Sequence, residues 1–127
     1  VIKTESSFRV TARGRHGEIG LMQILPKTAA WLAAQAGVSE AQLNLEDPSI
    51  NIRIGATYFA QLRRNFEGIG GRYVAAYNMG STNVRRLVAK NIEPTIYPAR
   101  VLSNYNKLYK NLSKNIRAAQ SQQIAAN

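Results

Sequence analysis

The sequence predicts a mainly α-helical protein with little or no β structure, on three observations. Apolar side chains recur every four residues over one long segment, which places them on one face of a helix; they are Ile50, Ile54, Tyr58 and Leu62. Residues typical of helix starts precede the apolar segments, and glycines follow them. The alternation of apolar and polar residues that marks a strand is scarce. With 127 residues, 45% of them hydrophobic, the chain is long enough for one domain with a modest core.

The first predicted element is a short helix at the beginning of the chain, which closes around residues 6–7. Its apolar side can be formed by Val1, Ile2 and Phe8. This places Glu5 in the last turn, half sheltered from water. Shelter raises the pKa of a carboxyl group, so Glu5 is a candidate proton donor. The alternative is an ordinary glutamate at the surface or at a helix end, where most acidic residues lie.

A basic loop over residues 9–20 comes next. Its glycines permit unusual backbone angles and the close approach of a ligand, so we expect the loop to line a cleft. Residues 18–21 within it have the character of a short extended piece. Pro26 then fits the first position of a helix that we expect to end at Gly37, a residue suited to the left-handed stop.

Two helix starts follow in the middle of the chain. Ser39 and Gln42 have the spacing of a capping box, which predicts a single helical turn. Asp47 can cap the next helix, Pro48 fits its first position, and Gly68 ends it. The apolar stripe of this helix is typical of core packing, so we assign it no catalytic role.

The last third of the chain is predicted to hold three helices. Residues 72–78 form a short apolar helix, a turn at Gly80 leads to a second over residues 83–90, and residues 97–116 form the third. An apolar set in this last helix is predicted to face inward: Val101, Leu102, Tyr105, Leu108, Tyr109 and Leu112. The composition beyond Ser113 is typical of a fraying tail.

The charge of the chain is unusual, because 17 Lys and Arg stand against 7 Asp and Glu, for a formal net charge of +10. Such a balance implies a polyanionic partner, and nucleic acid, an anionic membrane surface or a cell-wall polymer all fit. The absence of cysteine excludes disulfides and thiolate chemistry. The single histidine, His16, is more simply a residue of the loop rim, so we predict neither a metal nor a cofactor.

The limits of the chain give two further expectations. No apolar run approaches the roughly 20 residues of a membrane span, so no transmembrane segment is predicted. The chain opens inside a predicted helix with no cap before Val1, so we expect a signal segment or another domain upstream.

Glu5 has no second acid beside it in the sequence that suggests a nucleophile. The sole aspartate, Asp47, is better explained as a helix cap. Retaining glycosidases of the usual kind need two carboxylates about 5 Å apart, and inverting enzymes need a wider pair with a water between them. A single acid therefore indicates a different mechanism.

Three short motifs occur in order along the chain: Glu5-Ser6, Gly20-Leu21-Met22-Gln23 and Ala76-Tyr77-Asn78. Together they resemble the E-S, G-L-M-Q and A-Y-N motifs of the family-1 lytic transglycosylases, lysozyme-like enzymes related to goose-type lysozyme. The resemblance extends from Val1 to about Tyr109. It implies a lysozyme-like helical domain with a substrate cleft, which we place at residues 1–112, with a helix end and tail at residues 113–127.

The resemblance also implies an activity, the non-hydrolytic cleavage of the MurNAc-GlcNAc β-1,4 bond of peptidoglycan. In that family one glutamate, here Glu5, acts first as general acid and then as base. The sugar's own 6-hydroxyl is the nucleophile and closes on C1, which leaves 1,6-anhydro-MurNAc ends.

Six residues receive substrate-binding roles by the same resemblance: Ser6, Met22, Gln23, Tyr77, Asn78 and Glu93. The amide of Gln23 suits hydrogen bonds to sugar hydroxyl or acetamido groups. Other interpretations stand beside these roles, since Met22 suits a core gap and Asn78 suits a helix end. Tyr77 can equally be a buried tyrosine with an ordinary hydrogen bond.

Two positions depart from the family pattern. Glu93 is assigned through a partial match to a Glu-Thr-Arg-x-Tyr-Val segment, in which Tyr97 takes the place of the tyrosine. Its alternative role is to complement a helix N-terminus. The family often has a serine nine residues after the acid, where this chain has Gly14.

The resemblance sets the expected partners and location. We expect peptidoglycan glycan strands as substrate, cell-wall-spanning or secretion machinery as a candidate client, and no nucleic acid. The protein is expected to be a monomer exported to the periplasm or cell envelope.

Two alternatives remain, a muramidase that uses water and a basic helical module that binds polyanions without chemistry. The second is supported by a run of basic residues: Arg85, Arg86, Lys90, Arg100, Lys107, Lys110, Lys114 and Arg117. Peptidoglycan, with its peptide carboxylates, explains the same charge.

Overall fold

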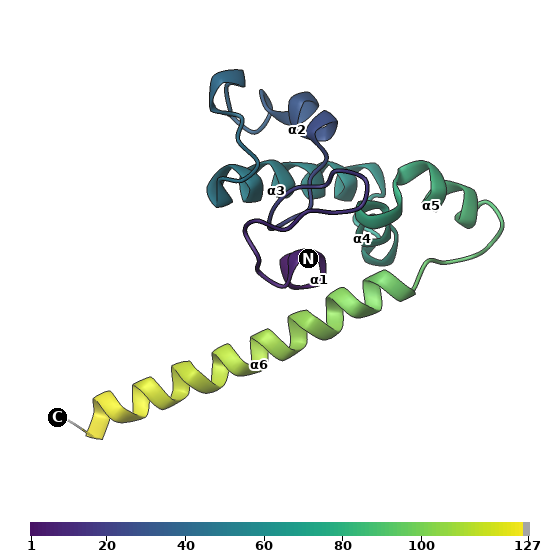
Figure 1. Ribbon diagram of the computed structural model, residues 1–127. Coiled ribbons are helices and arrows are strands. Elements are labelled where there is room, and N and C mark those ends of the chain that lie inside the picture. The colour runs from purple at the N-terminus through teal and green to yellow at the C-terminus, as the bar shows by residue number, and fades with distance from the viewer. Residues whose placement is uncertain (126–127) are drawn as a thin grey trace.

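A computed structural model describes residues 1–125 of the chain (Figure 1). The elements are α1 (Ile2–Ser6), α2 (Pro26–Leu32), the 3-10 turn η1 (Glu40–Gln42), α3 (Pro48–Asn65), α4 (Gly70–Met79), α5 (Ser81–Val88) and α6 (Ile96–Ala125). Over these residues the extended structure is limited to two isolated bridges, which join Ile19 to Arg13 and to Ile24. The predicted mainly α-helical fold is confirmed.

Helix α3 runs through the middle of the fold (Figure 1) and begins as the sequence predicts. The Asp47 carboxylate accepts hydrogen bonds from the backbone amides of Ser49 and Ile50, at 2.8 and 3.0 Å. Pro48 occupies the first turn, where its missing N–H costs nothing. The helix ends at Asn65, and Gly68 follows with a left-handed φ of 76°. The residues at both ends of α3 therefore determine where the helix begins and ends.

The core has two parts, and α3 contributes to both. One contains Ile54 of α3 with side chains from α2 and the preceding loop, and the other contains Leu62 of α3 with side chains from α4 and α5. The rings of Tyr58 and Tyr77 pack against both parts, with their centroids 5.4 Å apart. These two tyrosines therefore tie α3 to α4 at the junction of the core.

The loop between α1 and α2 is anchored to α3 by one buried side chain, Asn51. Its amide nitrogen donates to the carbonyls of Ile19 and Leu45, at 2.8 and 2.9 Å, and its carbonyl oxygen accepts from the Met22 amide at 2.8 Å. Asn51 is fully buried, so these partners replace the water that each group would otherwise bind. A Cβ on Gly20 would lie 2.4 Å from the Asn51 nitrogen, which explains why glycine is required there.

Two details of the N-terminal half differ from the prediction. Phe8 does not share the apolar side of α1 but is 51% exposed, because Ser7 and Phe8 both adopt left-handed φ values after the helix ends. Helix α2 stops at Leu32 and not near residue 36, although Gly37 has the expected left-handed φ of 65°. A short stretch of turns fills the interval.

The largest correction concerns α6, whose apolar stripe does not face inward. The helix is real, but five of the six residues expected to be buried are exposed: Leu102, Tyr105, Leu108, Tyr109 and Leu112. Only the first turns of α6 pack on α1 and α4, through the buried Tyr97 and a hydrogen bond of 3.1 Å from Asn104 to Thr4. The rest of the helix leads away from the other elements (Figure 1) and continues past Ser113 to Ala125, where we had expected a tail. Periodicity identifies an apolar face but does not say whether another element covers it.

No helix among residues 1–125 combines the length and the apolar character needed to cross a membrane.

Candidate active site

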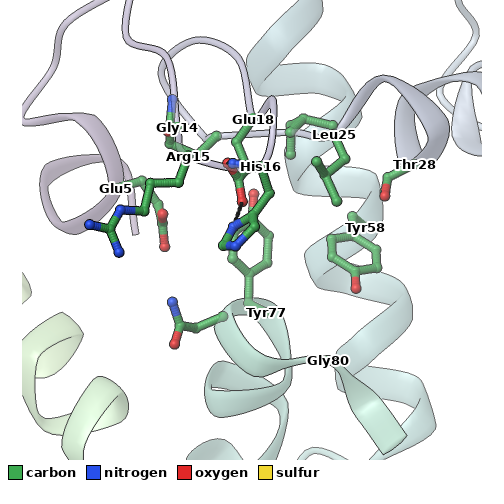
Figure 2. A pocket seen from close by; sticks show the side chains of 13 residues that line it. Glu5, Gly14, Arg15, His16, Glu18, Leu25, Thr28, Tyr58, Tyr77 and Gly80 are labelled. Atoms are coloured by element: carbon green, nitrogen blue, oxygen red, sulfur yellow. Dashed lines mark hydrogen bonds and ion pairs between the residues drawn. The ribbon is translucent and has the colours of Figure 1, made fainter.

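One pocket of about 400 Å³ lies where α1, the loop between α1 and α2, the first turn of α2, α3 and α4 meet. Glu5 reaches it from α1, Glu18 and Gln23 from the loop, Tyr58 from α3 and Tyr77 from α4. Figure 2 shows Glu5, Glu18 and Tyr77 directed toward the same space. Residues far apart in sequence thus form one site with a glutamate at its edge.

Glu5 lies in α1 and is half-buried, as the sequence predicts. Burial raises the pKa of its carboxyl group, and the negative charge of Glu18 acts in the same direction. Tyr97 and Arg100 lower this pKa, but burial is the largest influence and the net shift is upward. A carboxyl group with a raised pKa keeps its proton closer to neutral pH, as a general acid requires.

Tyr97 is the tyrosine that contacts Glu5. Its hydroxyl donates a hydrogen bond to the Glu5 carboxylate, and burial together with this contact raises the pKa of the Tyr97 hydroxyl. The hydroxyl of Tyr77 donates instead to the carbonyl of Met22, at 2.9 Å. Sequence reasoning considered Tyr77 as the partner of Glu5 and missed Tyr97, whose only signal was its place in the partial match that contains Glu93.

The remaining loop residues are held by the backbone around them. Gln23 has a left-handed φ of 50°, and its side-chain nitrogen donates to the carbonyls of Gly20 and Ala12, at 2.9 and 3.2 Å. Glu18 accepts a hydrogen bond of 2.9 Å from the His16 amide. Glu18 lines the pocket and so adds a second carboxylate to that of Glu5. The sequence did not indicate this, because twelve residues separate the two acids and no regular spacing relates them.

The other predicted site residues lie in different surroundings. Asn78 is exposed and lines the pocket. Ser6 is buried, and its hydroxyl donates to the Ile2 carbonyl at 3.2 Å. Met22 is buried in the core, and Glu93 is exposed and forms an ion pair with Arg72. Ser6, Met22 and Glu93 do not line the pocket.

Replacing Tyr97 with phenylalanine tests the contact to Glu5. The hydrogen bond from Tyr97 lowers the pKa of Glu5, so its loss should raise that pKa further and move the alkaline limb of the pH-rate profile to higher pH. For the glycan cleavage that the family resemblance implies, we expect the rate at the optimum to fall about tenfold, because the carboxylate loses the donor that orients it. Tyr105→Phe is the matched control, since Tyr105 is exposed on the same helix. A Tyr97→Phe variant with the parent's rate and pH profile contradicts this role.

Comparisons with known proteins agree on one family. The family model described as Transglycosylase SLT domain matches residues 1–99. A transglycosylase of Enterobacteria phage PRD1 is 38% identical over 113 residues, or 87% of this chain. The membrane-bound lytic murein transglycosylase C of Haemophilus influenzae (strain PittGG) is 31% identical over 107 residues, or 76% of this chain.

Solved structures give the same result for the fold. The 70 kDa soluble lytic transglycosylase of Escherichia coli matches with a TM-score of 0.62 and 31% identity, over 70% of this chain and 15% of that one. An inactive mutant of the lytic transglycosylase Slt of Pseudomonas aeruginosa matches with a TM-score of 0.60 and 38% identity, over 67% of this chain and 14% of that one. The chain spans 37% and 30% of the length of the phage and Haemophilus relatives.

Proposed function

This chain belongs to the transglycosylase SLT family, and we propose that it is the catalytic domain of a peptidoglycan lytic transglycosylase. Residues 1–112 form the catalytic unit in this proposal, and residues 113–127 continue from it. The observation that carries the proposal is a sheltered glutamate with a raised pKa at the edge of a pocket, within a chain of this family. A carboxyl group with a raised pKa keeps its proton to higher pH and can donate it to a glycosidic oxygen.

The proposed reaction cleaves the β-1,4 bond between MurNAc and GlcNAc without water. Glu5 gives its proton to the bridging oxygen, and the bond from that oxygen to C1 of MurNAc breaks. The Glu5 carboxylate then takes the proton of the sugar's own 6-hydroxyl, whose oxygen closes on C1. The product ends in 1,6-anhydro-MurNAc, and Glu5 regains the proton that it gave.

The surroundings of Glu5 support both halves of this cycle. Burial favours the protonated form that starts the reaction. The Tyr97 hydroxyl and Arg100 favour the carboxylate that forms in the middle. Because these influences oppose one another, Glu5 can both release its proton and take one up. A residue that acts first as an acid and then as a base must do both.

Substrate contacts are proposed for the residues that line the pocket. Both donors of the Gln23 amide are used by loop carbonyls, so its oxygen is the atom left to accept a hydrogen bond from a sugar. Tyr77 contributes its ring to the pocket wall, while its hydroxyl holds the Met22 carbonyl. Asn78 offers an exposed amide at the edge. Ser6, Met22 and Glu93 would act indirectly, through the packing and ion pairs that they make.

The proposed setting is the cell envelope. The net charge of +10 suits the anionic peptide carboxylates of peptidoglycan, and the Haemophilus relative is named as a murein transglycosylase. We propose that the protein is exported, acts as a monomer, and has cell-wall-spanning or secretion machinery as a candidate client.

Digestion of purified peptidoglycan sacculi tests the proposal. The protein should release soluble muropeptides, and raising the salt concentration should slow the release without abolishing it. A basic binding module without chemistry should bind the sacculi, lose that binding as salt rises, and release nothing. Sacculi that stay intact at low salt contradict the proposed function.

Hydrolysis is a second candidate, because Glu18 supplies the second carboxylate that the sequence alone did not suggest. A muramidase would use such a group to activate water. The two reactions give different chain ends, so the products decide between them.

A further inference from the structure

Glu18 is a charged residue that the proposed reaction does not use, although it lines the same pocket as Glu5 (Figure 2). Its carboxylate is fixed at both oxygens by His16. The His16 amide donates to Oε2 at 2.9 Å, and the His16 ring nitrogen Nδ1 lies 3.2 Å from Oε1. The Glu18 side chain is only 24% exposed, whereas the His16 side chain is 79% exposed. These two contacts from His16 hold the Glu18 carboxylate in the pocket.

Gly14 leaves the space that this carboxylate fills. A Cβ on residue 14 would lie 2.1 Å from Oε2 of Glu18 and 2.8 Å from the side-chain oxygen of Gln23. No side chain fits there while Glu18 keeps its place. The chain thus combines a glycine, a carboxylate and an amide in one packed arrangement that lines the pocket.

The two carboxyl groups of the pocket are driven toward opposite protonation states. Burial raises the pKa of Glu5, whereas the backbone amides of Glu18 itself and of His16 lower the pKa of Glu18. A pair of acids whose surroundings separate their pKa values in this way is typical of sites that need one proton donor and one permanent negative charge.

On this geometry, and resting on the proposed function, we propose that Glu18 is a second functional carboxylate of the pocket, a fixed negative charge that acts on Glu5 and on the sugar bound beside it. The transition state of glycosidic cleavage carries positive charge on the sugar ring, and a fixed carboxylate in the same pocket stabilises that charge. The same negative charge disfavours ionisation of Glu5 and helps it to stay protonated. His16 contacts both oxygens of Glu18, which suits a fixed charge better than a base that must turn toward water.

Other charged or titratable groups also face these two acids. Glu5 is near Tyr97, Tyr77 and Arg100, and Glu18 is near His16. Arg15 lines the same pocket. Among these groups, Glu18 is the one whose negative charge raises the pKa of Glu5. Removing that charge should therefore lower the pKa of Glu5.

The test is Glu18→Gln, measured as kcat and KM on MurNAc-GlcNAc oligosaccharides across the pH range. Glutamine keeps the size and an acceptor for the His16 amide but removes the charge. We expect kcat to fall at least about tenfold with KM nearly unchanged, because the charge acts in the transition state. The alkaline limb of the profile should move to lower pH, since Glu5 loses the neighbour that helps to keep it protonated.

Two further variants complete the design. Glu18→Asp keeps the charge on a shorter side chain and should keep the alkaline limb near that of the parent. Glu67→Gln is the control for loss of one negative charge, because Glu67 is exposed and lies outside the pocket. Melting temperatures of all variants verify that the fold is intact.

Three outcomes overturn the inference. A Glu18→Gln variant with the parent's kcat and pH profile leaves Glu18 without a function. A raised KM with unchanged kcat makes it a simple binding contact. Loss of reducing ends alone, with anhydro ends still formed, makes it the base for a water molecule. If the parent protein itself releases no product, the proposed function fails, and that failure is distinct from all three.

Discussion

Replacing Glu5 with glutamine should reduce glycan cleavage by at least about 100-fold, the loss typical of removing a general acid. Glutamine keeps the size of the side chain and still accepts the hydrogen bond from Tyr97, but it has no proton to give. Binding of glycan should persist, because the pocket keeps its shape. Release of soluble fragments from sacculi measures the first effect, and co-sedimentation with sacculi measures the second.

The stability of this variant is also predicted. Burial raises the pKa of Glu5 in the folded protein, so the folded state pays no penalty at acidic pH, where the group is protonated. The penalty appears as the pH rises through the raised pKa, because the ionised carboxylate is then half-buried. Glu5→Gln should therefore be at least as stable as the parent at neutral pH, in a melting experiment.

A matched control is Glu40→Gln, which removes a carboxylate from the exposed turn η1. Its cleavage rate should equal that of the parent. Near-normal cleavage by Glu5→Gln, or an equal loss in both variants, contradicts the assignment of Glu5 as the acid.

Replacing Asn51 with alanine should produce the largest loss of stability of any single change described here. The variant leaves the Met22 amide and the Leu45 carbonyl without a partner, while the Ile19 carbonyl keeps its hydrogen bond of 3.0 Å from the Ile24 amide. Each unsatisfied buried group costs about 1–3 kcal/mol, so we expect the free energy of unfolding to fall by about 2 kcal/mol or more. Denaturant unfolding followed by circular dichroism measures the difference.

The control for this variant is Asn106→Ala, on the exposed surface of α6. We expect it to change the free energy of unfolding by less than about 0.5 kcal/mol. If Asn51→Ala costs less than about 1 kcal/mol, Asn51 does not anchor the loop as the hydrogen bonds indicate.

The parts of the fold with strong local signals could be predicted from sequence. The start of α3 depends on Asp47 and Pro48, which act on the backbone of their own helix. The short helix that carries Glu5 was predicted from an apolar side formed by Val1, Ile2 and Phe8, of which Phe8 lies outside the helix and is exposed. The family was indicated by the three short motifs, and the match over residues 1–99 shows it.

Features that depend on contacts through space could not be predicted. The Tyr97 hydroxyl reaches Glu5 across 92 positions of sequence, and Asn51 reaches Met22 across 29. Glu18 enters the pocket because of the path of a loop, which its residues do not encode by any regular spacing. The prediction that the apolar face of α6 is buried failed for the same reason. The spacing of its apolar residues is that of a buried helix, but no other element within residues 1–125 covers them.

The central claim, that Glu5 cleaves the glycan without water, is tested most directly by digesting peptidoglycan in water enriched in oxygen-18. A lytic transglycosylase closes C1 with the sugar's own 6-hydroxyl, so the new ends should be anhydro ends that carry no label. A hydrolase adds one labelled oxygen to each new end. Mass spectrometry of the fragments separates the two results, because anhydro ends are also lighter by one water. Unlabelled anhydro ends, absent from the Glu5→Gln digest, are the result that we predict, and labelled reducing ends contradict it.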